Sequence, residues 1–430
     1  MFKNLVNAFK TKEVRVKILL TLLLLLVYRI GCCLPIPGLQ ADALVGVTAD
    51  NSFLGLLNSI SGGSLSNGAI LALGVSPYIS ASIIIQLLSI AIPSWQRLSK
   101  EGEEGRKKIA RYTRIAALVL SIAQAVGIVL AFGDIIDPRA LWNGAPSWLI
   151  STFVGIALVA GGMFTVWLGE RISDIGIGNG LSLLIFVGIV SSLGTSLLTS
   201  IQGISSNLSH LWNILIFLVA VLLIFFLIVF VDLAERRVPV QYAKQIKGRK
   251  MYGGQSTNIP IRVNASGVMP IIFASALLTF PQLIMSIFWP NSDAMQWYNT
   301  NMGAGSWPYI VLTALLILFF SYFYSQISFN PDDISKQIQQ NGGFIPGIRP
   351  GKPTADYLRK ISNRVVLFGA IFLAFIALVP NLVFKAISGD SALINGFSAT
   401  SLLIVVSVAL EFDKQLEAQL LMRNYRGFLK

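Results

Sequence analysis

The chain has 430 residues, of which 54% are hydrophobic and only 12% are charged, and its mean hydropathy is +0.70. A soluble domain carries about twice that fraction of charged residues, and a soluble chain of this length would expose far too much apolar surface. The composition therefore excludes a set of soluble domains and indicates an integral membrane protein.

The apolar residues fall into ten long runs separated by polar and charged segments. Each run is close to the roughly 20 residues that cross a hydrocarbon core, and backbone hydrogen bonding in lipid requires such runs to be helical. The runs are 18–34, 76–92, 115–132, 148–168, 181–198, 211–231, 265–288, 308–327, 365–384 and 397–410. We expect the last run to continue past Glu411. The sequence thus predicts an all-α integral membrane protein with ten transmembrane helices.

A basic and amphipathic stretch, residues 1–17, precedes the first run and is suited to lie on the membrane surface. A cleaved signal peptide would need a small-residue cleavage site after its apolar core. Here Arg29 follows the core, and nine further runs come later. We therefore interpret residues 18–34 as a first span that is retained.

The basic residues give the orientation of the spans, because lysine and arginine accumulate in cytoplasmic loops. If the N-terminus is cytoplasmic, the outer loops contain only Arg139 and Lys385 of the 33 basic residues, and Arg29 lies within the first span. All the others then fall in cytoplasmic segments. Both termini are therefore predicted to be cytoplasmic, and the net charge of +13 is mostly a topology signal.

Two cytoplasmic loops, 232–264 and 328–364, are longer than simple connections need to be. Their basic residues have two interpretations. One is a topology signal combined with contact to lipid headgroups. The other is a docking surface for an acidic or RNA-bearing partner. The length of the loops favours docking.

The residues that usually carry enzyme chemistry are scarce. His210 is the only histidine, and the adjacent Cys32 and Cys33 cannot form an ordinary disulfide with each other. The glycines at 176–180 follow an apolar run rather than a strand, and the segment 253–257 lacks the lysine of a phosphate-binding loop. We expect no enzyme activity, no cofactor and no metal site.

Ionisable residues are also scarce inside the spans. This argues against a secondary transporter of a small solute, because coupling ions need buried acidic sites. Arg29 is the exception and has no acidic partner nearby in the sequence. Two interpretations remain open: it snorkels or caps carbonyls near the helix end, or it forms a fixed polar brace between the halves of the bundle.

Five motifs occur in order along the chain. They are ALGVSPYISASIIIQLL at 72–88, GERI at 169–172 with GNGLSLLIF at 178–186, ERRVPVQYAK at 235–244 with GRKMYGGQST at 248–257, GGFIPGIRPG at 342–351, and QLEAQL at 415–420. Together they resemble the SecY family of protein-conducting channels. The similarity extends over nearly the whole chain and is weakest in the outer loops 133–146 and 291–307.

The resemblance implies two pseudo-symmetric halves around a central hourglass pore: 18–200 with spans one to five, and 201–430 with spans six to ten. It implies a channel that conducts unfolded polypeptides across the bacterial cytoplasmic membrane and inserts membrane proteins into it. The implied partners are SecE, SecG, SecA, the ribosome, polypeptides that carry a signal sequence, and membrane lipids. A secondary transporter of a small solute remains the first alternative. A structural or insertase-like protein at the lipid interface, which would not need a pore ring, is the second.

By resemblance, six isoleucines form the pore ring of this channel. They are Ile79, Ile83, Ile185, Ile189, Ile272 and Ile404. The first two, and likewise the next two, are four positions apart, so each pair shares one helix face. Such a ring makes a narrow dewetted constriction that stops ions and yields to a passing chain. For any one isoleucine taken alone, ordinary packing or lipid contact is the simpler interpretation.

The segment 51–67, between the first two spans, resembles the plug of the family. Its apolar spacing suits a helix of about two turns, which is too short to cross a membrane. The residues concerned are Phe53, Leu54, Leu57 and Ile60, followed by Gly62 and Gly63. We expect the glycines and serines at 61–64 to let the plug swing. A re-entrant or interfacial helix with no gating role is the alternative.

The family opens sideways between spans two and seven. We expect Gln86, Gln124 and Asn264 at that lateral gate, where buried amides bond each other or become hydrated on opening. General helix–helix bonding explains any single amide equally well. Pro77 and Pro270 are expected to bend or break the two gate helices, because proline removes a helical hydrogen bond.

Five basic residues are expected to contact a cytoplasmic partner, because arginine forms bidentate contacts with carboxylates and phosphates. They are Arg236, Arg237, Arg249 and Lys250 in loop 232–264, and Arg349 in loop 328–364. By resemblance, Arg349 contacts SecA or the ribosome. The plain alternative is a set of solvated loop charges.

Overall fold

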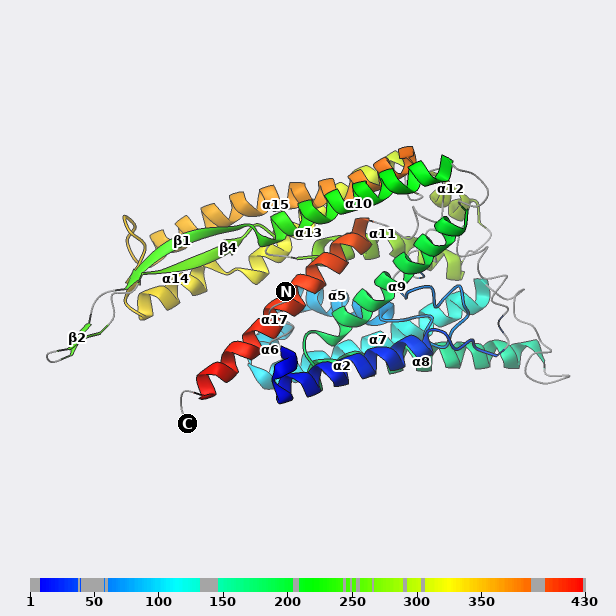
Figure 1. Ribbon diagram of the computed structural model, residues 1–430, viewed down its shortest axis with the longest axis horizontal. Helices are drawn as coiled ribbons and strands as arrows, with labels where there is room; N and C mark the ends of the chain where they lie inside the picture. Colours follow the sequence, from blue (N-terminus) through cyan, green and yellow to red (C-terminus); the bar gives the residue numbers. More distant parts are fainter. Residues whose placement is uncertain are drawn as a thin grey trace. The chain divides into compact units, whose positions relative to one another are not determined.

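A computed structural model describes most of the chain, and it is largely helical (Figure 1). The described residues are 8–37, 39, 58, 61–131, 146–203, 209–242, 245–247, 250–252, 256–264, 267–288, 292–302, 306–387 and 399–427. The chain forms two compact units. The first comprises Met1–Ile214, Ala276–Ser306 and Ser388–Lys430, and the second comprises Leu215–Ser275 and Trp307–Ile387.

All ten predicted runs fall on helices. In chain order, these are α2 (Lys12–Gly31), α5 (Ser76–Ala91), α7 (Glu103–Ala131), α8 (Ser147–Ile175), α9 (Gly180–Gly203), α10 (Ser209–Leu233), α11 (Met269–Phe288), α13 (Trp307–Ser328), α15 (Lys352–Ile387) and α17 (Ala399–Gly427). Three shorter helices are α6 (Pro93–Lys100), α12 (Asp293–Asn301) and α14 (Pro331–Gln340). Helix α17 extends well past Glu411, which confirms that the last run continues beyond it.

Six helices of the described part are long and apolar enough to cross a membrane. They lie in α7, α8, α9, α10, α13 and α15. Helices α5 and α11 contain shorter apolar stretches, Ser76–Ser89 and Met269–Leu278. The chain is therefore a multi-pass membrane protein, while the number of ten spans stays a prediction.

The side chains of α10 support this conclusion. Phe226 and Phe230 are 69% and 66% exposed, whereas Phe217 and Ile228 of the same helix are buried. A helix that is apolar on both its buried and its exposed face is typical of a membrane span, because lipid takes the place of water on the outer face.

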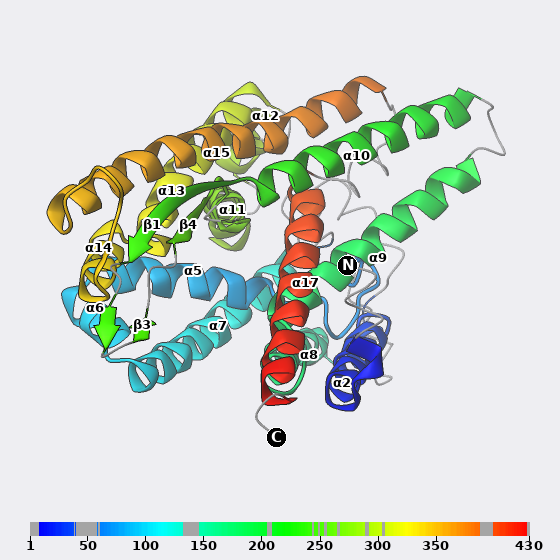
Figure 2. The same cartoon turned by 60° about the vertical axis from the view of Figure 1, so that its left-hand side comes forward.

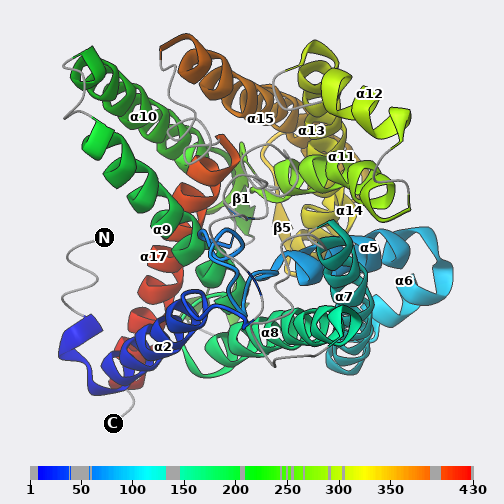
Figure 3. The ribbon, with the colours of Figure 1, turned by 90° about the vertical axis from the view of Figure 1, so that its right-hand side faces the viewer.

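The first unit contains a layer of closely packed helices. Figures 1 and 3 show α8 beside both α2 and α7, and α5 also packs on α7. The segment that leads into α5 lies against this layer. Its buried Leu65 and Leu73 share a hydrophobic core with Ile128 of α7 and Ile150 of α8. The segment before α5 is thus part of the core of the first unit.

The second unit contains strands that the all-α prediction missed. Strands β1 (Glu235–Tyr242), β4 (Ser256–Arg262) and β5 (Gly343–Phe344) form an antiparallel sheet in the order β4-β1-β5, and β2 (Gln245–Lys247) pairs with β3 (Lys250–Tyr252). Figure 2 shows β1 continuing from the end of α10. Val238 and Val240 are buried, while their neighbours on β1 are exposed, which is the alternation of a half-buried strand.

This sheet and two helices form a small folded domain, which we call the loop domain. It joins loop 232–264 to loop 328–364 and includes α14 and the start of α15. Its core residues are Val238, Val240, Ile261, Ile338, Ile345 and Leu358, all nearly inaccessible. The two predicted loops are therefore one packed structure rather than separate flexible connections.

Polar contacts at the ends of the helices fix α14 in the loop domain. The side chain of Asn330 accepts a hydrogen bond from the backbone N–H of Asp332 and so caps the first turn of α14. Arg359 of α15 bonds Asp332 at 2.7 Å, which ties the start of α14 to α15. The hydroxyl of Ser335 donates to the carbonyl of Gly351 at 2.7 Å.

Candidate functional site

The segment that precedes α5 is bound tightly to the chain that follows α2. Pro35 and Ala69 form an antiparallel bridge. The N–H of Ile36 donates to the Gly68 carbonyl at 2.8 Å, and the N–H of Ile70 donates to the Leu34 carbonyl at 2.9 Å. The C-terminal side of the predicted plug is thus held by backbone hydrogen bonds inside the first unit.

Arg29 lies in the last turn of α2 and contacts this segment. Its guanidinium donates to the Gly62 carbonyl at 3.2 Å and to the hydroxyl of Ser191 on α9. The side chain therefore bonds a backbone carbonyl near the end of α2, as the first interpretation allows, and it also joins three segments. Both acceptors lie in the first unit and in the predicted half 18–200, so these two bonds do not form a brace between the predicted halves.

The plug residues can be compared only in part. Phe53, Leu54, Leu57 and Ile60 lie outside the described residues. The described residues Ser61 and Ser64 are 2% and 0% exposed, and Gly62 is also buried. The polar stretch expected to let the plug swing is therefore mostly packed and hydrogen-bonded, because Arg29, α9 and the chain after α2 enclose it.

The predicted pore ring comes from four helices. Ile79 and Ile83 lie on α5, Ile185 and Ile189 on α9, Ile272 on α11 and Ile404 on α17. Ile83, Ile185, Ile189 and Ile404 are buried, and the other two are half-buried. Helix α17 packs on α9. None of the six side chains is fully exposed, and the ring itself stays a prediction.

The three amides predicted at the lateral gate have different surroundings. Gln124 of α7 is 6% exposed, and its Oε1 is buried with no hydrogen-bond partner among the described residues. Gln86 is half-buried on α5, which packs on α7. Asn264 donates from Nδ2 to Oδ1 of Asp232 at 2.6 Å and so connects the chain after β4 to the end of α10. Their place at a gate stays a prediction.

The expectation for the two prolines was wrong. Pro77 is in the first turn of α5, and Pro270 is the second residue of α11. A proline there costs no helical hydrogen bond, because the first N–H groups of a helix have no partner within it. Pro281 lies inside α11, a position that the sequence prediction did not single out.

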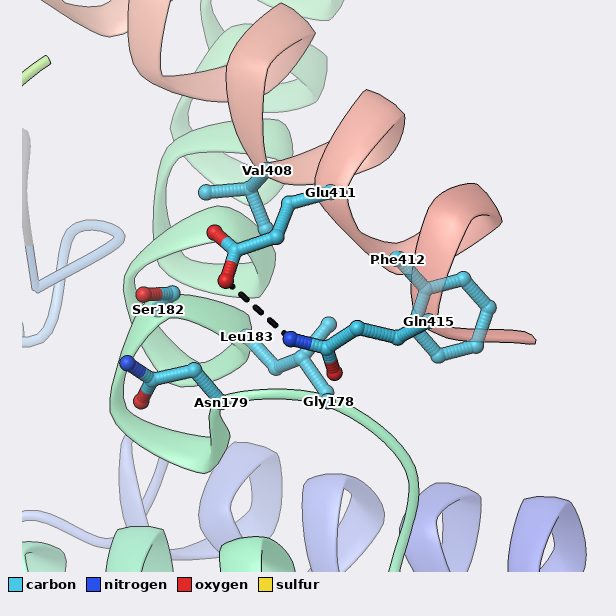
Figure 4. Close-up of a pocket in the computed structure, with 8 residues that line it drawn as sticks. All are labelled: Gly178, Asn179, Ser182, Leu183, Val408, Glu411, Phe412 and Gln415. Carbon is cyan, nitrogen blue, oxygen red and sulfur yellow. Dashed lines mark hydrogen bonds between the residues drawn. The ribbon is translucent and has the colours of Figure 1, made fainter. Parts of the chain in front are cut away.

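A small cleft lies where the start of α9 meets α17 (Figure 4). Asn179 and Ser182 of α9 and Glu411 and Gln415 of α17 line it together with apolar side chains. Glu411 Oε1 accepts from Gln415 Nε2 at 3.1 Å. Its cavity volume of about 10 Å³ is far below the roughly 300–1,000 Å³ of small-molecule pockets. The cleft does not favour a solute-binding site.

Basic residues are exposed on the loop domain. Arg236 and Arg237 extend from β1, and Arg237 bonds Glu235 at 2.8 Å. Arg349 is exposed at a tip where Gly347 and Gly351 have positive φ angles of 82° and 94°. The hydroxyl of Thr354 donates to the Arg349 carbonyl at 2.8 Å. Arg349 thus sits on an ordered turn, which suits a docking role.

The remaining basic residues predicted to contact a partner cannot be placed. Arg249 and the side chain of Lys250 lie outside the described part of the chain, as does the side chain of His210. Cys32 is buried and Cys33 is exposed, and both are free thiols. Within the described residues, no cluster of His, Cys, Asp or Glu has the geometry to hold a metal ion.

Two contacts were not anticipated from the sequence. Arg114 Nε of α7 pairs with Glu170 Oε1 of α8 at 2.6 Å, and this pair joins two neighbouring helices. Outside the spans, the hydroxyl of Tyr298 on α12 donates to the Leu278 carbonyl at 2.5 Å, and burial raises the pKa of Tyr298. Both contacts depend on how separate helices pack, so local sequence patterns carry no signal for them.

Known proteins match the whole length of this chain. The sequence model of the SecY family matches residues 69–412. The chain is 41% identical to the protein translocase subunit SecY of Halalkalibacterium halodurans, with 100% of both chains covered, and 43% identical to that of Streptomyces galbus, also with 100% of both covered.

Solved structures with low sequence identity share the fold. A structure described as that of a protein conducting channel has a TM-score of 0.65 at 19% identity, covering 94% of this chain and 91% of that chain. The Sec61 channel of a canine ribosome–channel complex has a TM-score of 0.60 at 17% identity, with the same coverage. The extent of the sequence matches, in agreement with this fold, places the chain in the SecY family.

Proposed function

We propose that this chain is the channel subunit of a bacterial protein translocase. It conducts unfolded polypeptides across the cytoplasmic membrane and releases membrane segments sideways into the bilayer. The observation that carries the proposal is a set of buried isoleucines on α5, α9 and α17. They belong to the same unit as Gly62 of the predicted plug segment, which Arg29 contacts. Full-length similarity to protein translocase subunits supports it.

In this proposal ten helices span the membrane and both termini are cytoplasmic, as the distribution of basic residues indicates. SecE and SecG complete the channel, and SecA or a translating ribosome supplies the energy and docks on the loop domain. A structurally similar relative is described in a ribosome-bound complex, which supports the ribosome as partner. The alternative of a solute transporter lacks support, because no relative reported above is described as one.

Replacing Ile83 and Ile189 by glycine is expected to raise the ion leak of the resting channel. Both side chains are buried, and removing them widens and hydrates the constriction that they are proposed to form. The measurement is ion flux through vesicles that contain the chain with SecE and SecG and no substrate polypeptide. An increase of about tenfold or more is expected, because dewetting depends steeply on the width and polarity of a pore.

The matched control is Val190→Gly on α9. Val190 follows Ile189 directly but is 43% exposed, so the control introduces the same flexible residue into the same helix turn without opening the proposed ring. Its leak is expected to equal that of the wild type. If the leak of the isoleucine variant also equals wild type, neither isoleucine belongs to the seal.

Charge reversal at Arg349 is expected to reduce SecA-driven transport strongly, because a glutamate cannot pair with the carboxylates of an acidic docking surface. Arg349→Glu should leave the fold intact, since the side chain is exposed and makes its described contact through the backbone carbonyl. The control is Lys336→Glu on α14, an equal change of charge at another exposed position of the loop domain. Full transport by Arg349→Glu would rule out the docking role.

A further inference from the structure

Two neutral oxygen atoms hold the guanidinium of Arg29 in the predicted first span. A charged side chain within a membrane raises the free energy of the folded protein unless specific groups replace the water that hydrates the charge. The ion pairs found among the described residues do not include Arg29. Its hydrogen-bond acceptors are the carbonyl of Gly62 and the hydroxyl of Ser191. The position of this charge therefore depends on two segments that both have to stay in place.

Gly62 lies directly on the backbone of α9. Its φ angle is +70°, and a Cβ atom added there would be 2.7 Å from the carbonyl oxygen of Gly188 and 2.9 Å from its Cα. The same Cβ would lie 2.9 Å from Nη1 of Arg29. Only glycine fits this approach. The C-terminal part of the predicted plug segment thus rests on α9, and Arg29 lies against the same contact.

The residues around Gly62 form a rigid base. The carbonyl of Asn58 accepts from the N–H of Gly63 at 2.8 Å, and Oδ1 of Asn58 accepts from the N–H of Ser66 at 2.9 Å. The hydroxyl of Ser64 donates to the Leu71 carbonyl. We call residues 58 and 61–66 the plug base. A movement of the plug together with its base would have to break the bond from Arg29 to Gly62.

The second acceptor of Arg29 connects the base to the predicted pore ring. Ser191 is on α9, two positions after the fully buried Ile189. One guanidinium therefore joins the plug base to a helix that supplies ring residues. We propose that Arg29 is a positioning residue that holds the plug base against α9 in the closed channel. Its hydrogen bonds break when the base and α9 separate. This inference rests on the proposed channel function.

The test compares ion leak and polypeptide transport in vesicles that contain the complete translocase. Arg29→Met removes both hydrogen bonds and keeps a long side chain. The resting leak per assembled channel is expected to rise about tenfold, because a charge-assisted hydrogen bond to a buried group is lost. Arg15→Met, an exposed arginine on the same helix, is the control and should leak as the wild type does.

Ser191→Ala is a milder variant, because it keeps the charge of Arg29 and removes one of its acceptors. It replaces Arg29→Met in the test if that variant does not assemble into channels. Its leak is expected to rise less than that of Arg29→Met. The control is Ser192→Ala, because the Ser192 hydroxyl bonds the Ile189 carbonyl of its own helix at 3.0 Å. The double variant Arg29→Met with Ser191→Ala should leak no more than Arg29→Met alone, because both changes remove one shared contact.

The outcomes separate this inference from the proposed function. If wild-type vesicles transport polypeptide but neither Arg29→Met nor Ser191→Ala raises the leak, Arg29 does not hold the plug base. A lower melting temperature with an unchanged leak per assembled channel would likewise overturn the inference, since it indicates a role in folding alone. Wild-type vesicles that transport no polypeptide with all partners present would instead contradict the proposed function.

Discussion

Replacing Gly161 by alanine is expected to destabilise the first unit by about 3 kcal/mol, the upper end of the usual cost of overpacking. Gly161 is on α8, and a Cβ atom there would lie 1.9 Å from the carbonyl oxygen of Ile70. That carbonyl cannot move away easily, because the N–H of Ile70 bonds Leu34 at 2.9 Å in the bridge behind the plug base. The added methyl group has to push two segments apart.

The adjacent Gly162 provides the control. A Cβ atom there would be 3.6 Å from the side chain of Leu73, which is ordinary contact. Gly162→Ala should change stability little, or raise it by up to about 1 kcal/mol through helix propensity. The measurement is thermal unfolding of the purified complex in detergent, together with the amount of chain in membranes. Equal stability of the two variants would mean that α8 does not approach the Ile70 backbone closely.

The spans could be predicted because their signal is local. About 20 consecutive apolar residues have to form a helix in lipid wherever they lie in the fold. All ten runs fall on helices for this reason. The closeness of their packing could not be predicted, because it depends on single glycines such as Gly161 and Gly62. A glycine in a contact of two backbones looks the same in sequence as a glycine in a turn.

The role of Arg29 shows what the sequence leaves open. The sequence places a charge in the first span, but its acceptors are 33 and 162 positions away. Neither acceptor is acidic, so no pairing of charges points to them. The pore ring was predicted in another way, from the resemblance to a family. The structure adds that four of its six isoleucines are buried.

The loop domain was missed for a related reason. The residues of its strand β1 alternate between exposed and buried around Val238 and Val240, but the charged residues beside them predicted a docking loop. The core draws on four separated segments, represented by Val240, Ile261, Ile338 and Leu358. Each segment alone is too short and too polar to indicate a folded domain. The structure therefore gives the basic residues of both loops one common platform.

Replacing Leu358 by alanine is expected to destabilise this platform by about 3 kcal/mol, within the range for buried leucines. Leu358 is 0% exposed and packs among strand and helix residues of the loop domain. The loss should increase local opening about a hundredfold without unfolding the spans. Limited proteolysis of the intact complex measures the opening as faster cleavage within 232–264 and 328–364. SecA-driven transport should fall with it, because Arg349 loses its ordered support.

Leu367→Ala, on the same helix α15, separates a local packing effect from a general effect of the leucine change. Leu367 is 49% exposed, so its removal leaves no cavity in the loop domain, and cleavage should stay at the wild-type rate. If Leu358→Ala were cleaved no faster than Leu367→Ala, the two loops would not share a core. If cleavage were faster but transport unchanged, docking would not require the ordered turn at Arg349. The pair of variants thus tests whether the fold of the loop domain, and not only its charge, serves the partner.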